Sequence, residues 1–248
     1  MKRLYVVGIG PGNKEYFTEE ALAALEASDV IYGYTVYNEL VRPLFPEKDY
    51  RATGMRQEAE RCERALQCAA EGTTTAMVCS GDAGVYGMAS PVLELSEQYP
   101  EVDVVVVSGV TAALSGAAIL GAPLSNDFVV QSLSDLLTPK ELLEKRLKAE
   151  ALGDFSIALY NPASRKRKDH LKWACDILLQ HGKAPDTVCG WVRNIGRDGE
   201  EAQLCTLAEL REAELDMFTT VFIGTSGTRV IHNRMVTPRG YDLTGGCT

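Results

Sequence analysis

The chain has 248 residues, of which 46% are hydrophobic, so it is long enough to bury one large core or two compact ones. Its formal net charge of −9 argues against a nucleic-acid partner, because phosphates require a basic face. No apolar run is long enough to cross a bilayer, and the first residues enter a strand at once, so we expect no signal peptide, no membrane partner and a cytoplasmic protein.

Cysteine and histidine usage bears on redox state and metal binding. The seven cysteines include no CxxC pair, which favours buried thiols in a reducing compartment over a disulfide framework. The three histidines, His170, His181 and His232, are scattered without ligand spacing, so we expect no dedicated metal site.

In chain order, short β-rich runs alternate with helical ones through the first half of the chain. Strands are predicted at residues 4–8, 30–32, 74–79 and 102–107, and helices at 18–28, 56–71 and 110–120. Thr18 supplies an N-cap for the first helix, and Glu19 and Glu20 supply acids near its positive end. Alternation with helix-length connections predicts βαβ units and a mostly parallel sheet.

A second α/β unit is predicted further along the chain. It has strands at 155–160, 187–193, 201–205 and 219–224, and helices at 165–180 and 207–214. The fold class is therefore α/β, with an N-terminal domain over residues 1–125 and a C-terminal domain with a mixed sheet over 126–248. The charged, helix-rich segment 138–153 is predicted to be the linker region.

Three apolar strands of this pattern run into glycine-bearing loops, at residues 6–13, 78–87 and 104–112. Glycine has no Cβ, so the backbone can approach a ligand closely there, and Asp82 in the second loop offers a fixed acceptor. Loops that follow parallel strands gather at one edge of the sheet, where open α/β sheets bind ligands. For the loop at residues 78–87 taken alone, a tight strand-to-helix turn is an equally good interpretation.

Dinucleotide binding is the obvious competing interpretation of the first loop. Its fingerprint needs G-x-G-x-x-G and an acid after the second strand. Gly8 and Gly10 fit, but Asn13 stands at the third glycine position, Pro11 lies where the helix should begin, and residues 32–34 are Tyr-Gly-Tyr. A nicotinamide-dependent oxidoreductase therefore remains only as an alternative of a different class.

Several motifs resemble, in order and spacing, the tetrapyrrole methylases that use S-adenosylmethionine. They are Val7-Gly-x-Gly-Pro-Gly-Asn13, Ser80-Gly-Asp-Ala-Gly84, Gly109-Val-Thr-Ala112 and Leu159-Tyr-Asn161, and the resemblance covers essentially the whole chain. Residues 32–37, 55–58, 132–139, 192–194 and 235–241 look like the branch that acts in cobalamin biosynthesis. The resemblance implies an active site in a cleft between two α/β domains. It also implies methylation of a corrin precursor at C-17 with ring contraction, on precorrin-3B or its cobalt-containing equivalent.

The resemblance also implies which residues contact the cofactor S-adenosylmethionine. An acid and backbone carbonyls suit its amino group and ribose, a threonine hydroxyl can hydrogen-bond, and a small alanine admits the methionine moiety. The cofactor-binding candidates are Pro11, Ser80, Gly81, Asp82, Val85, Thr111, Ala112, Tyr160, Asn161, Arg193 and Ile195.

Candidates for the substrate and for proton transfer follow from the chemistry of a polycarboxylate. Guanidinium groups pair bidentately with carboxylates, and the substrate-binding candidates are Gly10, Gly12, Arg56 and Arg197. The basic run 165–168 is the next candidate, although such a run more often begins a solvated helix. The proton-transfer candidates are Tyr34, Tyr37 and Asp135, each of which could equally be a loop hydrogen-bonding residue or a helix cap.

Three positions depart from the family pattern. Ser108 stands where a proline usually precedes the glycine, Asn126 where the branch often has histidine, and Gly33 where methylases of the uroporphyrinogen ring carry an aspartate. An amide cannot shuttle a proton as imidazole can, so no acid–base role is transferred to residue 126 or 33. A sibling methylase with another target and a tetrapyrrole-binding carrier also remain open. The resemblance further implies a homodimer.

Overall fold

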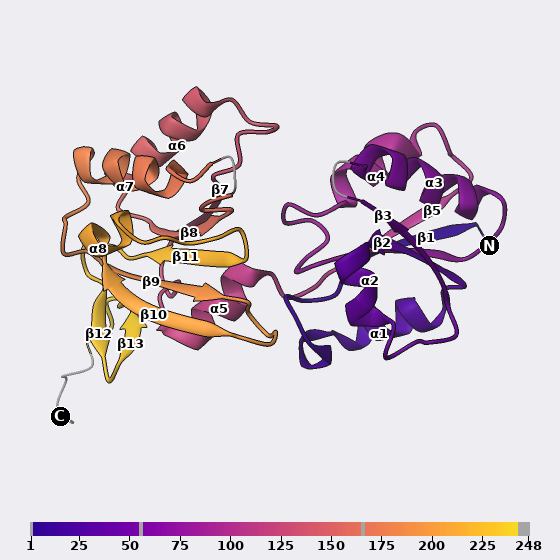
Figure 1. Cartoon of the computed structure of the whole chain (residues 1–248), viewed down its shortest axis with the longest axis horizontal. Helices are drawn as coiled ribbons and strands as arrows, with labels where there is room; N and C mark the ends of the chain where they lie inside the picture. The colour runs from indigo at the N-terminus through magenta and orange to yellow at the C-terminus, as the bar shows by residue number, and fades with distance from the viewer. Residues whose placement is uncertain (1, 55–56, 165–166, 243–248) are drawn as a thin grey trace. The chain divides into compact units, whose positions relative to one another are not determined.

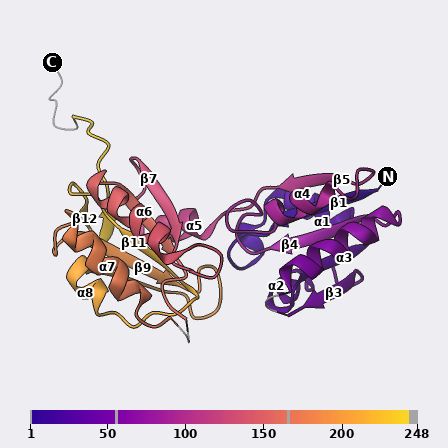
Figure 2. The same cartoon turned by 90° about the horizontal axis from the view of Figure 1, so that it is seen from above.

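The computed structural model describes residues 2–54, 57–164 and 167–242. The chain divides into two compact units, Met1–Ala112 and Ala113–Thr248. Each unit contains its own five-stranded sheet, and the two can be followed by colour from indigo to yellow in Figure 1 and Figure 2. No helix of the described residues is long and apolar enough to span a bilayer.

The first unit is a parallel α/β sheet with strand order β3-β2-β4-β1-β5. Its strands are β1 (Arg3–Gly8), β2 (Val30–Tyr34), β3 (Asp49–Thr53), β4 (Thr75–Cys79) and β5 (Asp103–Val107). Its helices are α1 (Glu19–Glu26), α2 (Thr35–Val41), α3 (Glu58–Ala70) and α4 (Ala89–Ser96), with a 3-10 turn η1 (Lys14–Tyr16). The predicted N-cap is confirmed, because the Thr18 hydroxyl accepts a hydrogen bond from Ala21 N at 3.1 Å.

Two apolar clusters lie on opposite faces of this sheet. Side chains alternate along a strand, so Val6 and Val7 of β1 enter different clusters. The cluster of Val6 also contains Leu66 of α3 and Val92 of α4, whereas that of Val7 contains residues of α1 and α2. The sheet is therefore covered by helices on both faces, which leaves its carboxyl edge to the glycine loops.

The second unit is built on a mixed sheet of order β10-β9-β11-β8-β7. Its strands are β7 (Phe128–Ser132), β8 (Ser156–Tyr160), β9 (Val188–Arg193), β10 (Glu201–Thr206) and β11 (Thr219–Ile223). β7 and β8 are parallel, and the other pairs are antiparallel. Helices α6 (Lys140–Leu152), α7 (His170–Gln180) and α8 (Leu207–Arg211) contribute to one apolar cluster with this sheet.

The opposite face of the second sheet packs against α5 (Ala112–Leu120). A Cβ on Gly116 would lie 2.9 Å from the Phe222 ring, and one on Gly190 would lie 2.9 Å from Leu120, so small residues let helix and sheet approach closely. The chain then forms a small sheet from β6 (Gly121–Ala122), β12 (Arg229–Ile231) and β13 (Arg234–Val236).

The α/β class with a parallel and a mixed sheet is confirmed, whereas the structure divides the chain at a different place from the predicted one. The boundary between the units falls after residue 112 rather than 125, because α5 packs on the second sheet. The predicted linker 138–153 contains α6, in which Leu143 and Leu147 are fully buried. Its many charges obscured this short apolar stripe, so the segment belongs to the second unit.

Candidate active site

The first two glycine loops of the first unit are joined through their backbones. Gly10 N donates to Gly81 O at 3.0 Å, and Gly81 N donates to Gly10 O at 2.8 Å. Both residues have a positive φ, +74° and +70°, which a glycine adopts without strain. The loops after β1 and β4 are therefore fixed side by side at the carboxyl edge of the sheet.

Asp82 fixes the second loop to the third. Its Oδ1 accepts hydrogen bonds from Gly84 N at 2.8 Å and Val85 N at 3.1 Å, and its Oδ2 accepts one from Gly109 N at 2.8 Å. Among the described residues no cation pairs with this carboxylate. Asp82 therefore holds the loops together and still presents an uncompensated negative charge.

Gly8 and Gly109 serve close packing between the loops. A Cβ on Gly8 would lie 2.7 Å from Gly109 N and 2.8 Å from Gly81 O, and a Cβ on Gly109 would meet Gly81 O in turn. The sequence suggested that the glycines make room for a ligand. At these two positions the structure shows that they make room for the neighbouring loop.

Gly12 and the remaining cofactor-binding candidates of the first unit belong to the same three loops. Pro11 and Gly12 are buried in the first loop, Ser80 is half-buried where β4 ends, and Thr111 is 9% exposed. Ala112 begins α5. The structure therefore brings together the cofactor-binding candidates that the sequence placed in the first three motifs, and it places Gly10 and Gly12 with them.

Tyr34 and Tyr37 lie where β2 ends and α2 begins. Their rings form an edge-to-face pair with centroids 5.5 Å apart. Just before them, a Cβ on Gly33 would meet Asn38 Oδ1 and would lie 2.6 Å from Val78. An aspartate could not occupy position 33 without displacing these neighbours, which agrees with withholding the acid–base role from it.

In the second unit, Tyr160 is the last residue of β8 and Asn161 follows it. The Tyr160 hydroxyl accepts a hydrogen bond from Ala113 N at 2.7 Å, and Asn161, at φ +54°, donates from Nδ2 to Ser132 Oγ at 3.0 Å. Leu133 N donates to Tyr160 O at 2.9 Å. The loops after β7 and β8 are thus connected at the carboxyl ends of two parallel strands.

The loop after β9 carries the other second-unit candidates. Arg193 pairs with Asp216 at 2.8 Å, and Ile195 is 5% exposed. Arg197 N donates to Asn194 O at 2.9 Å, and Asn194 has φ +51°. The Arg193 charge is therefore partly compensated within the protein. Arg56, the fourth substrate-binding candidate, lies outside the described residues.

Asp135 takes part in a network that the sequence did not reveal. Its carboxylate lies 3.3 Å from Arg167 Nη1 and 3.7 Å from His170 Nε2. Arg167 also donates to Ser134 Oγ at 2.6 Å and to Ser164 Oγ at 3.1 Å. Only pairing of β7 with β8 brings these loops together, so neither histidine spacing nor the basic run could have indicated this cluster.

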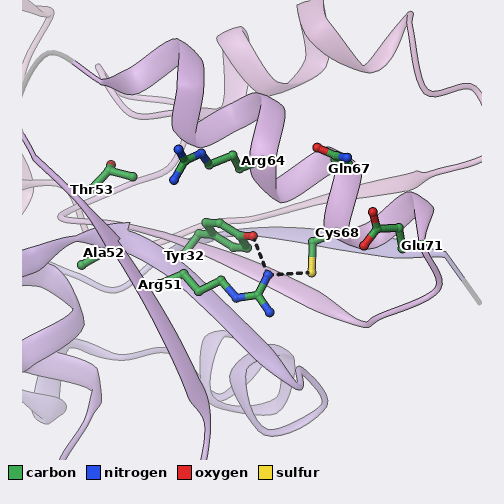
Figure 3. A pocket seen from close by; sticks show the side chains of 8 residues that line it. All are labelled: Tyr32, Arg51, Ala52, Thr53, Arg64, Gln67, Cys68 and Glu71. Carbon is green, nitrogen blue, oxygen red and sulfur yellow. Dashed lines mark hydrogen bonds between the residues drawn. The ribbon is translucent and has the colours of Figure 1, made fainter.

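Figure 3 shows a pocket of about 400 Å³ in the first unit, beside α3, β2 and β3. Arg51 in this pocket is paired with Asp49 and donates to the Tyr32 hydroxyl at 3.0 Å, and Arg64 is paired with Glu60. Both guanidinium groups are thus engaged within the protein. Apart from Tyr32 of the 32–37 motif, the pocket contains no residue singled out from the sequence, and it contains none of the candidate site residues. It is lined by Tyr32, Arg51, Ala52, Thr53, Arg64, Gln67, Cys68 and Glu71.

The donor set of the three loops fits a positively charged organic ligand. At Gly10 and Gly81 no side chain would separate a ligand from the backbone. Asp82 supplies a negative charge, and its carboxylate can accept more hydrogen bonds than the three from its amide partners. A sulfonium or an ammonium group suits such a site. In the described part of the chain, no cluster of His, Cys, Asp and Glu residues could hold a metal ion.

Comparison with known proteins gives concordant matches. A family model described as tetrapyrrole (corrin/porphyrin) methylases matches residues 3–211. A protein of Salmonella typhimurium named probable cobalt-factor III C(17)-methyltransferase is 45% identical, covering 97% of this chain and 100% of that protein. A precorrin-3B C(17)-methyltransferase of a Sinorhizobium species is 38% identical, covering 96% of each chain. The crystal structure of the methyltransferase CobJ superposes with a TM-score of 0.87 at 36% identity, covering 95% of this chain and 99% of that one.

Proposed function

The chain belongs to the tetrapyrrole methylase family, and we propose that it is an S-adenosylmethionine-dependent enzyme that methylates C-17 of a corrin precursor in cobalamin biosynthesis, with contraction of the macrocycle. The observation that carries this proposal is the 45% identity, over 97% of this chain and the whole of the relative, to a protein named probable cobalt-factor III C(17)-methyltransferase. The motifs of the three glycine loops and of Tyr160–Asn161 support it independently.

The first unit provides the chemistry that the cofactor needs. S-adenosylmethionine supplies a methyl group already activated as a sulfonium. The loops after β1, β4 and β5 would hold it through backbone groups, with the Asp82 charge favouring a cationic ligand and Thr111 assigned to the same site. In the second unit, Tyr160, Asn161, Arg193 and Ile195 are assigned to the adenosine moiety. Most of the rate enhancement would come from orientation of the reacting groups.

The substrate is assigned as a tetrapyrrole polycarboxylate. A chain with net charge −9 repels such a molecule at long range, so binding depends on local cations. Arg197 and Arg56 are the cations assigned to it, because a guanidinium group pairs bidentately with a carboxylate. The relatives carry two names, cobalt-factor III and precorrin-3B, so both forms of the substrate belong in the assay.

The test is an anaerobic methyl-transfer assay with purified protein and tritiated S-adenosylmethionine. Cobalt-factor III and metal-free precorrin-3B are supplied in parallel reactions, and products are read by mass spectrometry and mapped by NMR. Label at C-17 of either substrate supports the proposal. Label at another ring carbon would instead identify a sibling methylase.

Cofactor binding is tested separately by calorimetry without added metal. S-adenosylmethionine and its demethylated product should both bind, and NADH should not. Binding of NADH with no binding of either sulfur compound would favour an oxidoreductase and overturn the proposal. Binding of tetrapyrrole without methyl transfer would favour a carrier.

The homodimer and the cleft between the two domains remain predictions. Light scattering at micromolar concentration should give twice the chain mass of 27.0 kDa. A crystal structure with the demethylated cofactor should place it in contact with both Asp82 and Tyr160. A monomer would contradict the first prediction, and a cofactor confined to one unit would contradict the second.

A further inference from the structure

Arg61 is a buried cation near the start of α3. The residue is 4% exposed. Its Nε donates to the Thr53 hydroxyl at 2.6 Å, and its Nη2 donates to the carbonyl oxygen of Gly54 at 3.2 Å. A guanidinium group has more N–H donors than these bonds use, and both acceptors are neutral. The hydrogen bonds thus hold the side chain in place and leave its charge uncompensated.

No carboxylate of the described residues forms an ion pair with Arg61. The same end of the helix carries two acids: Glu58, which is exposed, and Glu60, which pairs with Arg64. Burying a charge is costly unless an opposite charge compensates it, so buried cations in proteins are normally paired. The position therefore suits an anionic ligand.

The other arginines of the first unit provide the contrast. Arg3, Arg51 and Arg64 each pair with a carboxylate. Arg42 is exposed to solvent. Among the arginines that the structure describes in this unit, Arg61 alone is both buried and without a carboxylate partner.

Arg61 is held at the carboxyl edge of the first sheet. Thr53, to which it donates, is the last residue of β3 and is paired in register with Tyr34, the last residue of β2. The strands of this sheet are parallel, so the glycine loops that follow β1, β4 and β5 lie at the same edge. This is the edge to which the proposed function assigns the ligands.

The thiol of Cys79, at the end of β4, connects Arg61 with the second glycine loop. Burial raises the pKa of Cys79 to about 12, the Arg61 charge opposes that rise, and the Asp82 charge adds to it. Both charges therefore act on the residue that directly precedes Ser80 and Gly81. The edge carries a buried positive charge in addition to the negative charge of Asp82.

We propose that Arg61 binds a carboxylate group of a ligand at this edge, an inference that rests on the proposed function. Both proposed ligands carry such a group: the macrocycle in its acidic side chains, and S-adenosylmethionine in its methionine moiety. The N–H groups of Arg61 that Thr53 and Gly54 leave unused would donate to the carboxylate oxygens, in charge-assisted hydrogen bonds. The charge of Arg61 is compensated only in the complex, so this residue contributes to ligand affinity rather than to the stability of the free protein.

The first experiment compares Arg61→Met, Arg61→Lys and Arg64→Met without ligand, by urea denaturation. Arg64 is the matched control, because it lies on the same helix, is largely exposed and pairs with Glu60. Arg61→Met removes an unpaired buried charge together with its hydrogen bonds, so its urea midpoint should stay near that of the parent. A midpoint far below the parent, with parental ligand affinities in Arg61→Lys, would show that Arg61 is structural and would overturn the inference.

The second experiment measures binding and identifies the source of the carboxylate. Calorimetry uses S-adenosylhomocysteine, which keeps the methionine carboxylate, and methylthioadenosine, which lacks it; cobalt-factor III is titrated by absorbance. If the cofactor is the source, Arg61→Met should bind S-adenosylhomocysteine about tenfold or more weakly and methylthioadenosine as the parent does. If the macrocycle is the source, cobalt-factor III should bind about tenfold or more weakly and with less dependence on salt, and both nucleosides should bind as in the parent.

Arg61→Lys keeps the positive charge without the planar fork, so its affinity should lie between those of the parent and Arg61→Met. Arg64→Met should match the parent for every ligand. Parental affinity of Arg61→Met for both S-adenosylhomocysteine and cobalt-factor III would overturn the inference. The proposed function is judged separately, by the position of the methyl label in the parent's product: label at a carbon other than C-17, with the affinity losses above, would overturn the proposed function and leave the carboxylate site standing.

Discussion

The Asp82 carboxylate accepts amides from two different loops, so a single side chain sets the distance between them. The sequence could indicate that an acid among glycines matters. It could not show that both carboxylate oxygens are already used within the protein. The charge of Asp82 is available to a cationic ligand, whereas most of its hydrogen-bonding capacity is structural.

Asp82→Ala should therefore weaken the fold as well as cofactor binding. Three backbone amides lose their acceptor, and the Gly109 amide is partly buried, so we expect the free energy of unfolding to fall by about 1–3 kcal/mol. Urea denaturation measures this change, and calorimetry with S-adenosylmethionine measures the loss of affinity. Asp82→Asn keeps one acceptor oxygen and should lie between the parent and the alanine variant. An alanine variant with the parental urea midpoint would show that water replaces the carboxylate at no cost.

Gly109→Ala should disturb the same loops without changing any charge. The added Cβ would meet backbone atoms of Gly81 and Gly8, which cannot rotate away, and overpacking of this kind costs about 1–3 kcal/mol. We expect lower thermal stability and weaker cofactor binding. Gly227→Ala is the control, because its Cβ would find only Thr225 Oγ1, at 3.8 Å. Equal melting temperatures for the two variants would contradict the packing argument.

At the scale of elements, the sequence predicted the central strands and the edge strands β5 and β10, but it missed the edge strands β3 and β7. β4 is buried at every residue and reads as an apolar run. β3 is an edge strand with mostly exposed or half-buried residues, and β7 is an edge strand of the second sheet. β3, with the sequence Asp-Tyr-Arg-Ala-Thr, lacks the hydrophobic pattern that comes from burial, so its composition resembles that of a loop.

The site could be predicted from the sequence only where the strands that position it were themselves predicted. The glycine loops follow β1, β4 and β5, whose hydrophobic patterns are strong. A backbone position with positive φ favours glycine, so such loops can be recognised in the sequence. The Asp135–Arg167–His170 cluster depends on β7 lying parallel to β8. Because β7 was not predicted, nothing in the sequence placed Asp135 beside residues more than thirty positions away. The sequence did not assign α5 to the second unit for a related reason. Its small residues allow close packing on Phe222, and that contact is visible only in the folded structure.

Lys183 connects the loops at one end of the second sheet, so we expect it to stabilise this part of the fold. Its side chain is 2% exposed, and Nζ donates to Asp154 Oδ1 and Phe155 O at 2.9 Å and to Gly224 O at 2.8 Å. Lys183→Met removes the ammonium donor from Phe155 O and Gly224 O and leaves Asp154 Oδ1 with Ser226 N, so we expect a loss of about 2–3 kcal/mol in urea denaturation.

Lys172→Met is the matched control for Lys183. Its Nζ pairs with Glu212 at 3.1 Å, but both side chains are largely exposed. Exposed pairs contribute about 0.2–1 kcal/mol, so this variant should stay close to the parent. If the Lys183 and Lys172 variants have the same urea midpoint, the buried ammonium group of Lys183 makes no net contribution to stability.

At the scale of the whole molecule, Glu150 on α6 makes stability depend on pH. The side chain is 5% exposed and Oε2 has no hydrogen-bond partner among the described residues. Burial raises the pKa of Glu150 to about 7, against the opposing effect of Arg146 and Lys183. The folded state therefore binds this proton more tightly than the unfolded state. The stabilisation is full below about pH 4.5 and is lost as the pH rises through about 7.

Glu150→Gln should remove this dependence. A pKa displaced from 4.5 to about 7 corresponds to about 3 kcal/mol by linkage, so at pH 8 the variant should be more stable than the parent by up to about that amount. At pH 4.5 the two should be similar. Urea midpoints at both pH values measure the difference. Glu144→Gln on the same helix is the control, since Glu144 is paired with Lys148 near the surface. A parallel pH profile for Glu150→Gln and the parent would contradict the assignment.

The buried thiols of the two units can serve as separate chemical probes of local unfolding. Burial raises the pKa of Cys62 to about 11 and of Cys79 to about 12 in the first unit. Burial likewise raises the pKa of Cys175 to about 12 and that of Cys189 well above its usual value in the second unit. Since only a thiolate reacts with alkylating reagents, these sulfurs become labelled when the surrounding structure opens. Peptide-resolved labelling rates would thus give an opening free energy for each unit within one intact chain, and added cofactor should slow whichever unit it binds.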